Sequence, residues 1–428
     1  MKVSFPRGIH PPHFKDTALL PIVKVEPEKG CLLVYPMVQH IGAPCKPLAE
    51  VGDTVLAGQK IGDTDARLSA PVLSAVSGVV KSVGEKIVIE NDGNYTLTRW
   101  AKADYTSLSA EEILRRIQGA GIVGLGGAGF PTHVKLGPPP DKKIDRILVN
   151  AAECEPFLTT DHRVMLEYTD DVLTGLKVVL HMFPEAKGII AVEDNKPDVI
   201  KILTEANKSD RISIVTLAAK YPQGGEKQLI FACTGREVPS GALPMDMGCI
   251  VQNVSTVAAV NKAVNEGQPL IRKVVTLAGG AASKPGNYQV PLGMKFKDLV
   301  KAVGGLKSEP YKIVVGGPMM GVSIPSLDAP VIKTTSGLLL LTEEEAKKPP
   351  EENCFRCGKC VAACPIGLVP VDLNRTAIKK NPLFVKFNGM DCILCASCSY
   401  ICPAHRDIAK SINDMRQELG NIQKLMTG

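Results

Sequence analysis

Two short cysteine runs near the end of the chain constrain its fold more than any other feature. They read CFRCGKCVAACP and CILCASCSYICP, and both follow the pattern C-x2-C-x2-C-x3-C-P. Their cysteines are Cys354, Cys357, Cys360 and Cys364 in the first run, and Cys392, Cys395, Cys398 and Cys402 in the second. Three thiols at two-residue spacing can converge from one loop, and the proline turns the chain after the fourth. Because thiolates are soft ligands, the pattern predicts two metal centres.

The spacing favours two [4Fe–4S] clusters over zinc. In two-cluster ferredoxins the first three cysteines of a run bind one cluster and the fourth binds the other. We therefore assign the first cluster to Cys354, Cys357, Cys360 and Cys402, and the second to Cys392, Cys395, Cys398 and Cys364. Zinc prefers four ligands in two C-x2-C pairs, and two complete four-cysteine runs disfavour it. Two clusters this close predict an electron-conducting, helical, ferredoxin-like domain.

Composition excludes several classes of protein. The chain has 428 residues, a formal net charge of +6 and only 4% aromatic residues, and no dense basic run that would follow a phosphodiester backbone. We therefore expect no nucleic-acid partner. The 13 cysteines are an odd number and are clustered, which fits a reducing compartment better than a disulfide framework. Neither a signal peptide nor a membrane-length apolar run is found, so we expect a soluble or peripheral chain.

A glycine-rich stretch, GLGGAGFPTHVKL at 124–136, has the spacing G-x-G-x-x-G. A Rossmann fingerprint with this spacing follows a strand and opens a helix. Here the preceding segment carries a capping box in Ser109 and Glu112 and predicts a helix. The first convincing strand, RILVNA at 146–151, comes afterwards. Because a helix precedes the glycines and the strand follows them, the stretch is not a Rossmann fingerprint.

The same stretch can still bind a phosphate. Glycines let backbone N–H groups approach an anion closely. Pro131 suits the first turn of a following helix, whose N-terminus would favour an anion, and Lys135 lies about one turn further on. A plain structural turn is the alternative that this stretch alone leaves open.

Three later stretches give the glycine turn a context. They read NAAECEP at 150–156, YPQGGEKQL at 221–229 and VQNVSTVAAV at 251–260, where Asn253 and Thr256 lie at a predicted helix start. Each alone is a common kind of loop. Together and in this order they resemble the flavin-binding motifs of the flavoprotein subunit of respiratory complex I, which binds FMN and NADH in one cavity.

The resemblance narrows when the whole chain is considered. The opening FPRGIHPPHFK, the barrel-like segment after it and the twin cysteine runs resemble the C subunit of the Rnf electron transport complex. This resemblance implies that FMN and NAD(H) are bound by Gly124, Gly126, Gly127, Gly129, Phe130, Lys135, Asn150, Tyr221, Gly224, Gly225, Asn253 and Thr256. It gives a catalytic part to three acids, Glu153, Glu155 and Glu226. Complex I has an aspartate at Ala152 and a glutamate at Gly225, which leaves the detailed hydrogen bonding open.

We expect a multidomain α/β fold. The predicted modules are an N-terminal segment (1–30), a biotinyl/lipoyl-like barrel sandwich (31–100), a Rossmann-like FMN/NADH-binding α/β domain (107–265), an SLBB-type β-grasp domain (270–330) and a two-[4Fe–4S] ferredoxin-like domain with a C-terminal helix (345–428). The barrel sandwich has no lysine from 62 to 80 to carry a swinging arm, so we expect it to be structural or a docking module. For the β-grasp domain a plain spacer is the simpler interpretation.

The last helix carries a narrow apolar seam at Ile408, Ile412, Met415, Leu419, Ile422 and Leu425. Such a seam usually covers its own domain, and docking to a partner subunit is the alternative.

The resemblance implies a function in electron transport. We expect a peripheral, NAD(H)-reactive flavo-iron–sulfur subunit of a ferredoxin:NAD oxidoreductase of the translocase class, which couples electron flow to Na+ or H+ transport. Its partners would be integral and iron–sulfur subunits at the cytoplasmic face of the bacterial membrane, with ferredoxin reached indirectly. Two alternatives stay open, a stand-alone NADH-dependent cobalamin reductase of a microcompartment and a non-catalytic iron–sulfur relay.

Overall fold

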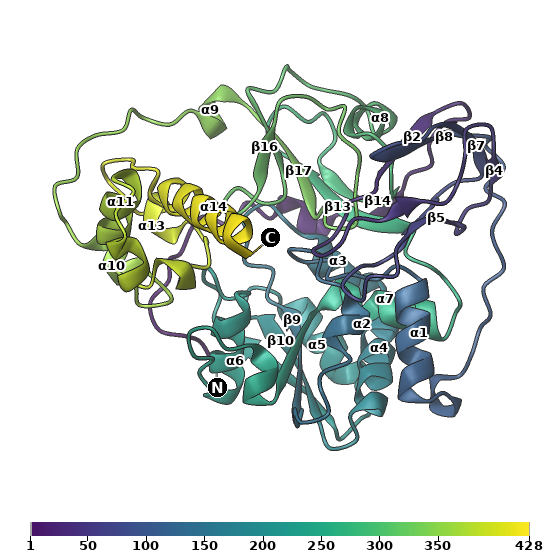
Figure 1. Cartoon of the computed structure of the whole chain (residues 1–428), viewed down its shortest axis with the longest axis horizontal. Coiled ribbons are helices and arrows are strands. Elements are labelled where there is room, and N and C mark those ends of the chain that lie inside the picture. Colours follow the sequence, from purple (N-terminus) through teal and green to yellow (C-terminus); the bar gives the residue numbers. More distant parts are fainter. Residues whose placement is uncertain (1, 428) are drawn as a thin grey trace.

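The modules lie side by side in the order that the sequence predicts. The computed structural model describes residues 2–427, with side chains through residue 421. Figure 1 shows the α/β domain in the lower part of the molecule, with the β-grasp domain and the barrel sandwich above it and the cluster domain to one side. The multidomain α/β fold class is therefore confirmed.

Four parallel strands form the sheet of the α/β domain, in the order β11-β10-β9-β12. The strands are β9 (Arg146–Ala151), β10 (Lys187–Glu193), β11 (Ile212–Leu217) and β12 (Cys249–Asn253). The helices are η2 (Tyr105–Ser107), α1 (Ala110–Gly119), α2 (Thr132–Lys135), α3 (Thr160–Glu167), α4 (Thr169–Met182), α5 (Pro197–Ala206), α6 (Glu226–Thr234), η3 (Pro244–Met247) and α7 (Val254–Val264). Most aliphatic side chains of β9, β10 and β12 are buried, as in a sheet covered on both faces. Their carboxyl ends meet at one edge.

The barrel sandwich consists of two small sheets. One contains β2 (Leu32–Pro36), β4 (Thr54–Val55), β7 (Gly78–Ser82) and β8 (Lys86–Asn91), and the other contains β3 (Lys46–Pro47), β5 (Lys60–Asp63) and β6 (Val72–Leu73). The tip between β5 and β6 lies against α2, where His133 Nε2 is 3.3 Å from the Arg67 carbonyl oxygen. The module is therefore docked on the chain just after the glycine turn.

The β-grasp domain has a six-stranded sheet, ordered β1-β14-β13-β17-β15-β16. Its elements are β1 (Ile22–Lys24), β13 (Arg272–Ala278), β14 (Gly286–Pro291), α8 (Phe296–Ala302), β15 (Lys312–Val315), β16 (Val322–Ile324) and β17 (Gly337–Leu341). The apolar run GLLLL forms β17, and all five of its residues are buried. β13 and β14 form an antiparallel hairpin, and α8 follows it.

The N-terminal segment ties the modules together. It pairs Val3 with Leu217 of β11, forms η1 (Asp16–Leu19), and adds β1 to the β-grasp sheet. Between these points the Gly8 N–H donates to the carbonyl of Ala363 in the cluster domain, at 3.2 Å. In Figure 1 this purple trace runs upward from the N-terminus. The sequence gives no signal for this strap.

The cluster domain is built from helices around the cysteine runs. Most are short, namely α10 (Lys359–Ala363), α11 (Pro370–Ile378), α12 (Leu383–Lys386), η4 (Gly389–Asp391) and α13 (Ser397–Tyr400), and the long α14 (Ile408–Thr427) follows them. The preceding helix α9 (Glu343–Ala346) packs against the β-grasp sheet instead. Ile408, Ile412 and Met415 of α14 are buried in this domain's own core. The first part of the apolar seam therefore covers its own domain, whereas Ile422 and Leu425 lie outside the described side chains. Among the described residues, no helix combines the length and hydropathy that a membrane span requires.

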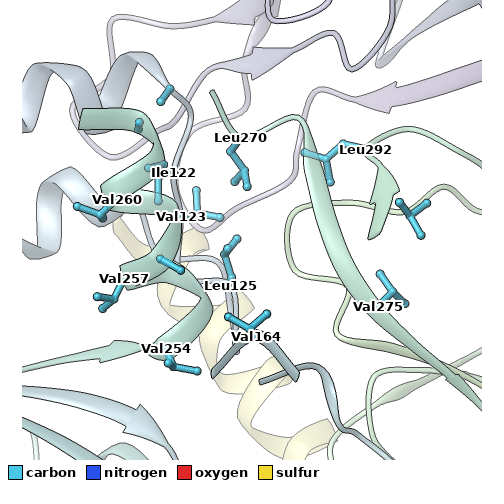
Figure 2. Close-up of a cluster of buried hydrophobic side chains, with 14 of the residues drawn as sticks. Ile122, Val123, Leu125, Val164, Val254, Val257, Val260, Leu270, Val275 and Leu292 are labelled. Atoms are coloured by element: carbon cyan, nitrogen blue, oxygen red, sulfur yellow. The ribbon is translucent and has the colours of Figure 1, made fainter. Parts of the chain in front are cut away.

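One continuous apolar core joins the α/β domain to the two modules above it. Figure 2 shows part of this core, where side chains of the glycine stretch, α3, α7 and the β-grasp domain meet. Leu125 of the glycine turn is 4% exposed and lies in this core. Packing thus fixes one side of the turn and leaves its other side free.

Candidate functional site

The glycine turn presents unpaired backbone donors to solvent. Residues 126, 127 and 128 are exposed, and the N–H groups of 126–129 make no hydrogen bond of good geometry with any described residue. The Gly124 N–H donates to the Phe130 carbonyl at 2.9 Å, which closes the base of the turn. Adjacent free N–H groups form a concave anion-binding surface, so the turn fits a phosphate group.

One detail of the sequence prediction is wrong. Pro131 is the N-cap of α2, not a residue of its first turn, and α2 is a single turn of four residues. So short a helix has little dipole to offer an anion. The donors that fit a phosphate are therefore those of the turn itself.

Two side chains at the start of α7, those of Asn253 and Thr256, contact the glycine turn. Asn253 caps α7 through its Oδ1, which accepts hydrogen bonds from the N–H groups of Ser255 and Thr256. Thr256 Oγ1 in turn accepts from the Leu125 N–H at 2.9 Å. A Cβ added at Gly126 would lie 2.4 Å from Asn253 Nδ2, so only glycine fits there. The structure thus brings Asn253 and Thr256 to the turn, as predicted.

A second set of predicted residues meets at the carboxyl edge of the sheet. Asn150 at the end of β9 is the register partner of Asn253 on β12. Its Nδ2 donates to the Gly224 carbonyl at 2.8 Å, and a Cβ at Gly224 would lie 2.6 Å from the Ala152 carbonyl. Gly225 is the N-cap of α6. The NAAECEP and YPQGGEKQL loops therefore meet beside the glycine turn, although 65 residues or more separate their motifs in the sequence.

The three predicted catalytic acids have different surroundings. Glu153 is buried and caps α3, accepting from the Thr160 hydroxyl and from the N–H groups of 161 and 162. Glu155 accepts the N–H groups of 319 and 320, at 3.0 Å each, and burial raises its pKa. Glu226 forms an ion pair with another predicted site residue, since its Oε1 lies 2.7 Å from Lys135 Nζ.

Asp161 belongs to the site but is not predicted. It lies in the first turn of α3 and accepts hydrogen bonds from Asn253 Nδ2 at 2.7 Å and from the Ser255 hydroxyl at 2.6 Å. Burial raises the pKa of its carboxyl group. It lies five residues beyond the last letter of the NAAECEP motif, and no spacing in the sequence singles it out.

Tyr221 joins the α/β domain to the cluster domain. Its hydroxyl donates to the backbone carbonyl of Cys395 at 2.8 Å, and its ring is 1% exposed. Around this contact lie Ile9 of the N-terminal strap, Ala363 and the partly buried Cys154. Burial raises the pKa of Cys154 to about 12, which fits a packing thiol rather than a reactive thiolate.

The four cysteines predicted for the second cluster surround one small cavity. These residues are Cys364, Cys392, Cys395 and Cys398. The rest of its lining is mostly apolar, including Leu368, Leu373 and Ile412. Among the described residues, no three His, Cys, Asp or Glu side chains are grouped so closely that they could hold a single metal ion. Four thiols around an apolar cavity fit a cubane cluster, and one of them, Cys364, comes from the other run.

The two cysteine runs share one backbone conformation. Arg356 and Leu394, two residues after the first cysteine of each run, have φ of 59° and 56°. Gly358 and Ala396, two residues further on, have φ of 76° and 59°. Residues other than glycine rarely adopt these left-handed backbone angles. Their recurrence at matching positions shows that the two loops have the same backbone conformation.

The cysteines assigned to the first cluster are less enclosed. Cys354 and Cys357 are exposed, and Cys360 and Cys402 are half-buried against the core of the cluster domain. The donor set therefore fits a cluster that lies nearer the surface than its neighbour.

Comparisons with known proteins match every module. Family models match for the RnfC barrel sandwich hybrid domain at 3–98, the Nuo51 FMN-binding domain at 117–262, the SLBB domain at 274–323 and the 4Fe-4S dicluster domain at 353–405. The boundaries predicted from the sequence differ somewhat from these and stay predictions.

Curated relatives resemble the chain over most of its length. It is 45% identical, over 97% of both chains, to the C subunit of the Na(+)-translocating ferredoxin:NAD(+) oxidoreductase complex of Acetobacterium woodii. It is 43% identical to the C subunit of the proton-translocating ferredoxin:NAD(+) oxidoreductase complex of Clostridium ljungdahlii, over 87% of this chain and 84% of that one. The C subunit of the ion-translocating oxidoreductase complex of Pseudomonas aeruginosa is 39% identical over 88% of this chain and 50% of its own length.

Solved structures support the fold. An NAD+-reducing [NiFe]-hydrogenase in the air-oxidized state matches with a TM-score of 0.51 at 20% identity, over 76% of this chain and 67% of that one. At this identity the match supports the arrangement of modules and nothing further.

Proposed function

The chain belongs to the RnfC family, the C subunits of the ion-translocating ferredoxin:NAD(+) oxidoreductase complexes, and from this premise we propose how its site is used. It is an oxidoreductase subunit with an FMN-binding domain and a dicluster domain. We infer that it is the NAD(H)-reactive subunit and lies peripherally at the cytoplasmic face of the bacterial membrane. Its partners would be the integral and iron–sulfur subunits, through which ferredoxin is reached.

FMN, when bound, supplies the conversion between hydride and single electrons that nicotinamide and iron–sulfur clusters require. The residues present fit its phosphate group, because the N–H groups of 126–129 are free and Gly126 leaves room beside Asn253. The Lys135–Glu226 pair links the turn to the 221–229 loop and would face the ligands together. Phe130, half-buried next to the turn, is proposed to lie beside the dinucleotide.

The observation that carries this proposal is the hydrogen bond from Tyr221 to the Cys395 carbonyl. Tyr221 belongs to a flavin-binding motif, and Cys395 is an assigned cluster ligand. The bond between them therefore supports the proposal that the flavin and this cluster lie close together. The cluster of Cys364, Cys392, Cys395 and Cys398 is then the one nearer the flavin. The cluster served by the exposed Cys354 and Cys357 would pass electrons to or from the next subunit.

Cofactor analysis of the full chain, purified without air, tests this function. We expect FMN, iron and acid-labile sulfide together, and a yellow colour that NADH bleaches. Iron without bound or bindable FMN would instead support a non-catalytic relay. Co-purification with integral membrane subunits is expected, and an isolated NADH-reactive protein with no such partners would favour the stand-alone reductase.

A further inference from the structure

Two buried lysines of the β-grasp domain donate hydrogen bonds to backbone carbonyls in or just before the glycine turn. Lys273, the second residue of β13, is 7% exposed, and its Nζ donates to the Leu125 carbonyl. Lys333, in the segment between β16 and β17, is 1% exposed, and its Nζ donates to the Gly121 carbonyl at 2.8 Å. No motif in the sequence includes either lysine, and the site as described above does not use them.

Burying a charged amine costs free energy, so the presence of two lysines at these positions needs an explanation. A charged amine loses its hydration on burial, and an apolar side chain of similar length would avoid this loss. Burial lowers the pKa of Lys273 and lowers that of Lys333 to about 7. A neutral amine still carries N–H donors, so the hydrogen bonds to the two carbonyls do not require the charge.

The contacts of Lys273 extend a hydrogen-bonded network around Leu125. The Leu125 carbonyl accepts from Lys273, and its N–H donates to Thr256 Oγ1. The Thr256 N–H donates to Asn253 Oδ1, and Asn253 Nδ2 donates to Asp161. Asp161 lies close enough to Lys273 for their charges to interact. Leu125 is therefore held on both sides of its peptide backbone.

The turn is held at its two ends as well. Lys333 also donates to the Pro71 carbonyl at 2.6 Å, so it joins the barrel sandwich to the residues that precede the turn. At the other end, the Ile41 N–H of the barrel sandwich donates to the Gly129 carbonyl at 3.3 Å. The carbonyls of 121, 125 and 129 thus all accept hydrogen bonds from neighbouring modules, whereas residues 126–128 between them stay exposed.

We propose that Lys273 and Lys333 are positioning residues for the anion-binding turn, and that the β-grasp domain thereby organises the flavin site of its neighbour. This inference rests on the proposed function, because it takes FMN phosphate as the ligand of the turn. It replaces the expectation of a plain spacer with a defined role. At metal sites, breaking the hydrogen bonds that orient the ligating groups typically lowers affinity about 10- to 100-fold, and we expect an effect at the low end of this range here.

The test uses the full chain, purified without air, with Lys273→Met and Lys333→Met. Lys301→Met is the matched control, since Lys301 lies on α8 of the same domain with its side chain 73% exposed. FMN is removed and titrated back, and the dissociation constant, iron content, cluster EPR spectrum and unfolding temperature are measured. We expect FMN to bind about tenfold more weakly in both site variants, with iron and EPR spectra unchanged. Lys273→Arg, which keeps a donor, should recover part of the affinity.

Three outcomes would overturn the inference. One is unchanged FMN affinity in both site variants; another is a parallel loss of flavin, iron and unfolding temperature, which marks a structural role alone. The third is no recovery in Lys273→Arg. If Lys273→Met does not accumulate, Lys333→Met and Lys273→Arg decide by the same criteria. A wild-type chain that binds no FMN would instead refute the proposed function.

Discussion

At the scale of single residues, Tyr221 joins the proposed flavin site to the cluster domain. Its hydroxyl donates to the Cys395 carbonyl, and Glu155 Oε1 lies 3.4 Å from the Tyr221 hydroxyl oxygen. A buried carbonyl that loses its donor stays unsatisfied, which weakens the junction between the α/β domain and the cluster domain.

Tyr221→Phe should therefore slow the reduction of the clusters by NADH, while FMN and iron contents stay at wild-type levels. The free energy of unfolding should fall by about 1 kcal/mol, the usual value of one such bond. The control is Tyr288→Phe, because the Tyr288 hydroxyl also donates to a backbone carbonyl, that of Lys284 at 2.9 Å, but within the β-grasp domain. Equal slowing in both variants would contradict the role of the Tyr221 bond.

Sequence reasoning finds residues that belong to motifs and misses those that support them. Asn150, Asn253 and Thr256 are predicted because they recur in a recognisable order, and the structure brings them together. Asp161 and Lys273 are missed, because each is an ordinary charged residue whose importance comes only from contacts across the fold. Burial of a charge is a property of packing, and local sequence does not encode it.

At the scale of elements, the glycine turn is the most sensitive to a small change. Gly126→Ala would place a methyl group 2.4 Å from Asn253 Nδ2. Asn253 would have to move, which disturbs both the turn and the cap of α7. We expect the dissociation constant for FMN to rise about tenfold, since overpacking of this kind costs about 1–3 kcal/mol.

Gly84→Ala is the control for this substitution. Gly84 lies between β7 and β8, and a Cβ there would meet nothing within 4 Å. FMN affinity should be unchanged in this variant. A Gly126→Ala protein that binds FMN as tightly as wild type would show that the turn is not the phosphate site.

The cysteine runs make a prediction about cluster identity. Cys357→Ser and Cys402→Ser should abolish the same EPR signal, although they lie in different runs. Cys395→Ser and Cys364→Ser should abolish the other signal. Cys233→Ser, which removes a thiol outside both runs, should leave both signals intact. Pairing of the signals by run, with Cys357 matched to Cys364, would contradict the crossed assignment.

Local signals predict some elements well. The capping box at Ser109 and Glu112 starts α1 as predicted, and the strand predicted at 146–151 is β9. β12 is not predicted, because the sheet is completed by a strand that returns beside β9 from nearly 100 residues away. The helix after Pro131 is a single turn that begins at Thr132, with Pro131 as its N-cap rather than in its first turn.

At the scale of the whole molecule, the N-terminal strap determines how the modules sit together. Lys15 is half-buried, and its Nζ donates to the carbonyls of Glu153 at 2.8 Å and Glu155 at 3.0 Å. These carbonyls belong to the acid motif at the carboxyl edge of the sheet. The strap therefore stabilises the loop that lies between the flavin site and the cluster domain.

Lys15→Met should lower the free energy of unfolding by about 2 kcal/mol, because the carbonyls that it leaves are buried and lose a donor. Denaturant unfolding, followed by circular dichroism, measures this change. Lys29→Met, at an exposed position of the same segment, is the control and should have no effect. Equal stability of the two variants would show that the strap is not fastened through Lys15.

The order of the modules is readable from the sequence, whereas their packing is not. Each module has its own periodicity or motif, and family models match four modules in the predicted order. The contacts that matter for function join parts far apart in the sequence, such as Tyr221 with Cys395 and Lys333 with Gly121. Such pairs carry no local pattern, and only the folded chain reveals them.

We propose that the glycine turn and the cysteine runs form one electron path through the Tyr221–Cys395 junction. Rapid mixing of the air-free protein with NADH, followed by optical and freeze-quench EPR spectra, resolves the order of events along this path. We predict that flavin bleaching comes first and that the cluster lost in Cys395→Ser is reduced before the cluster lost in Cys357→Ser. Clusters that dithionite reduces but NADH leaves oxidised, with the flavin fully bleached, would show that no such path exists.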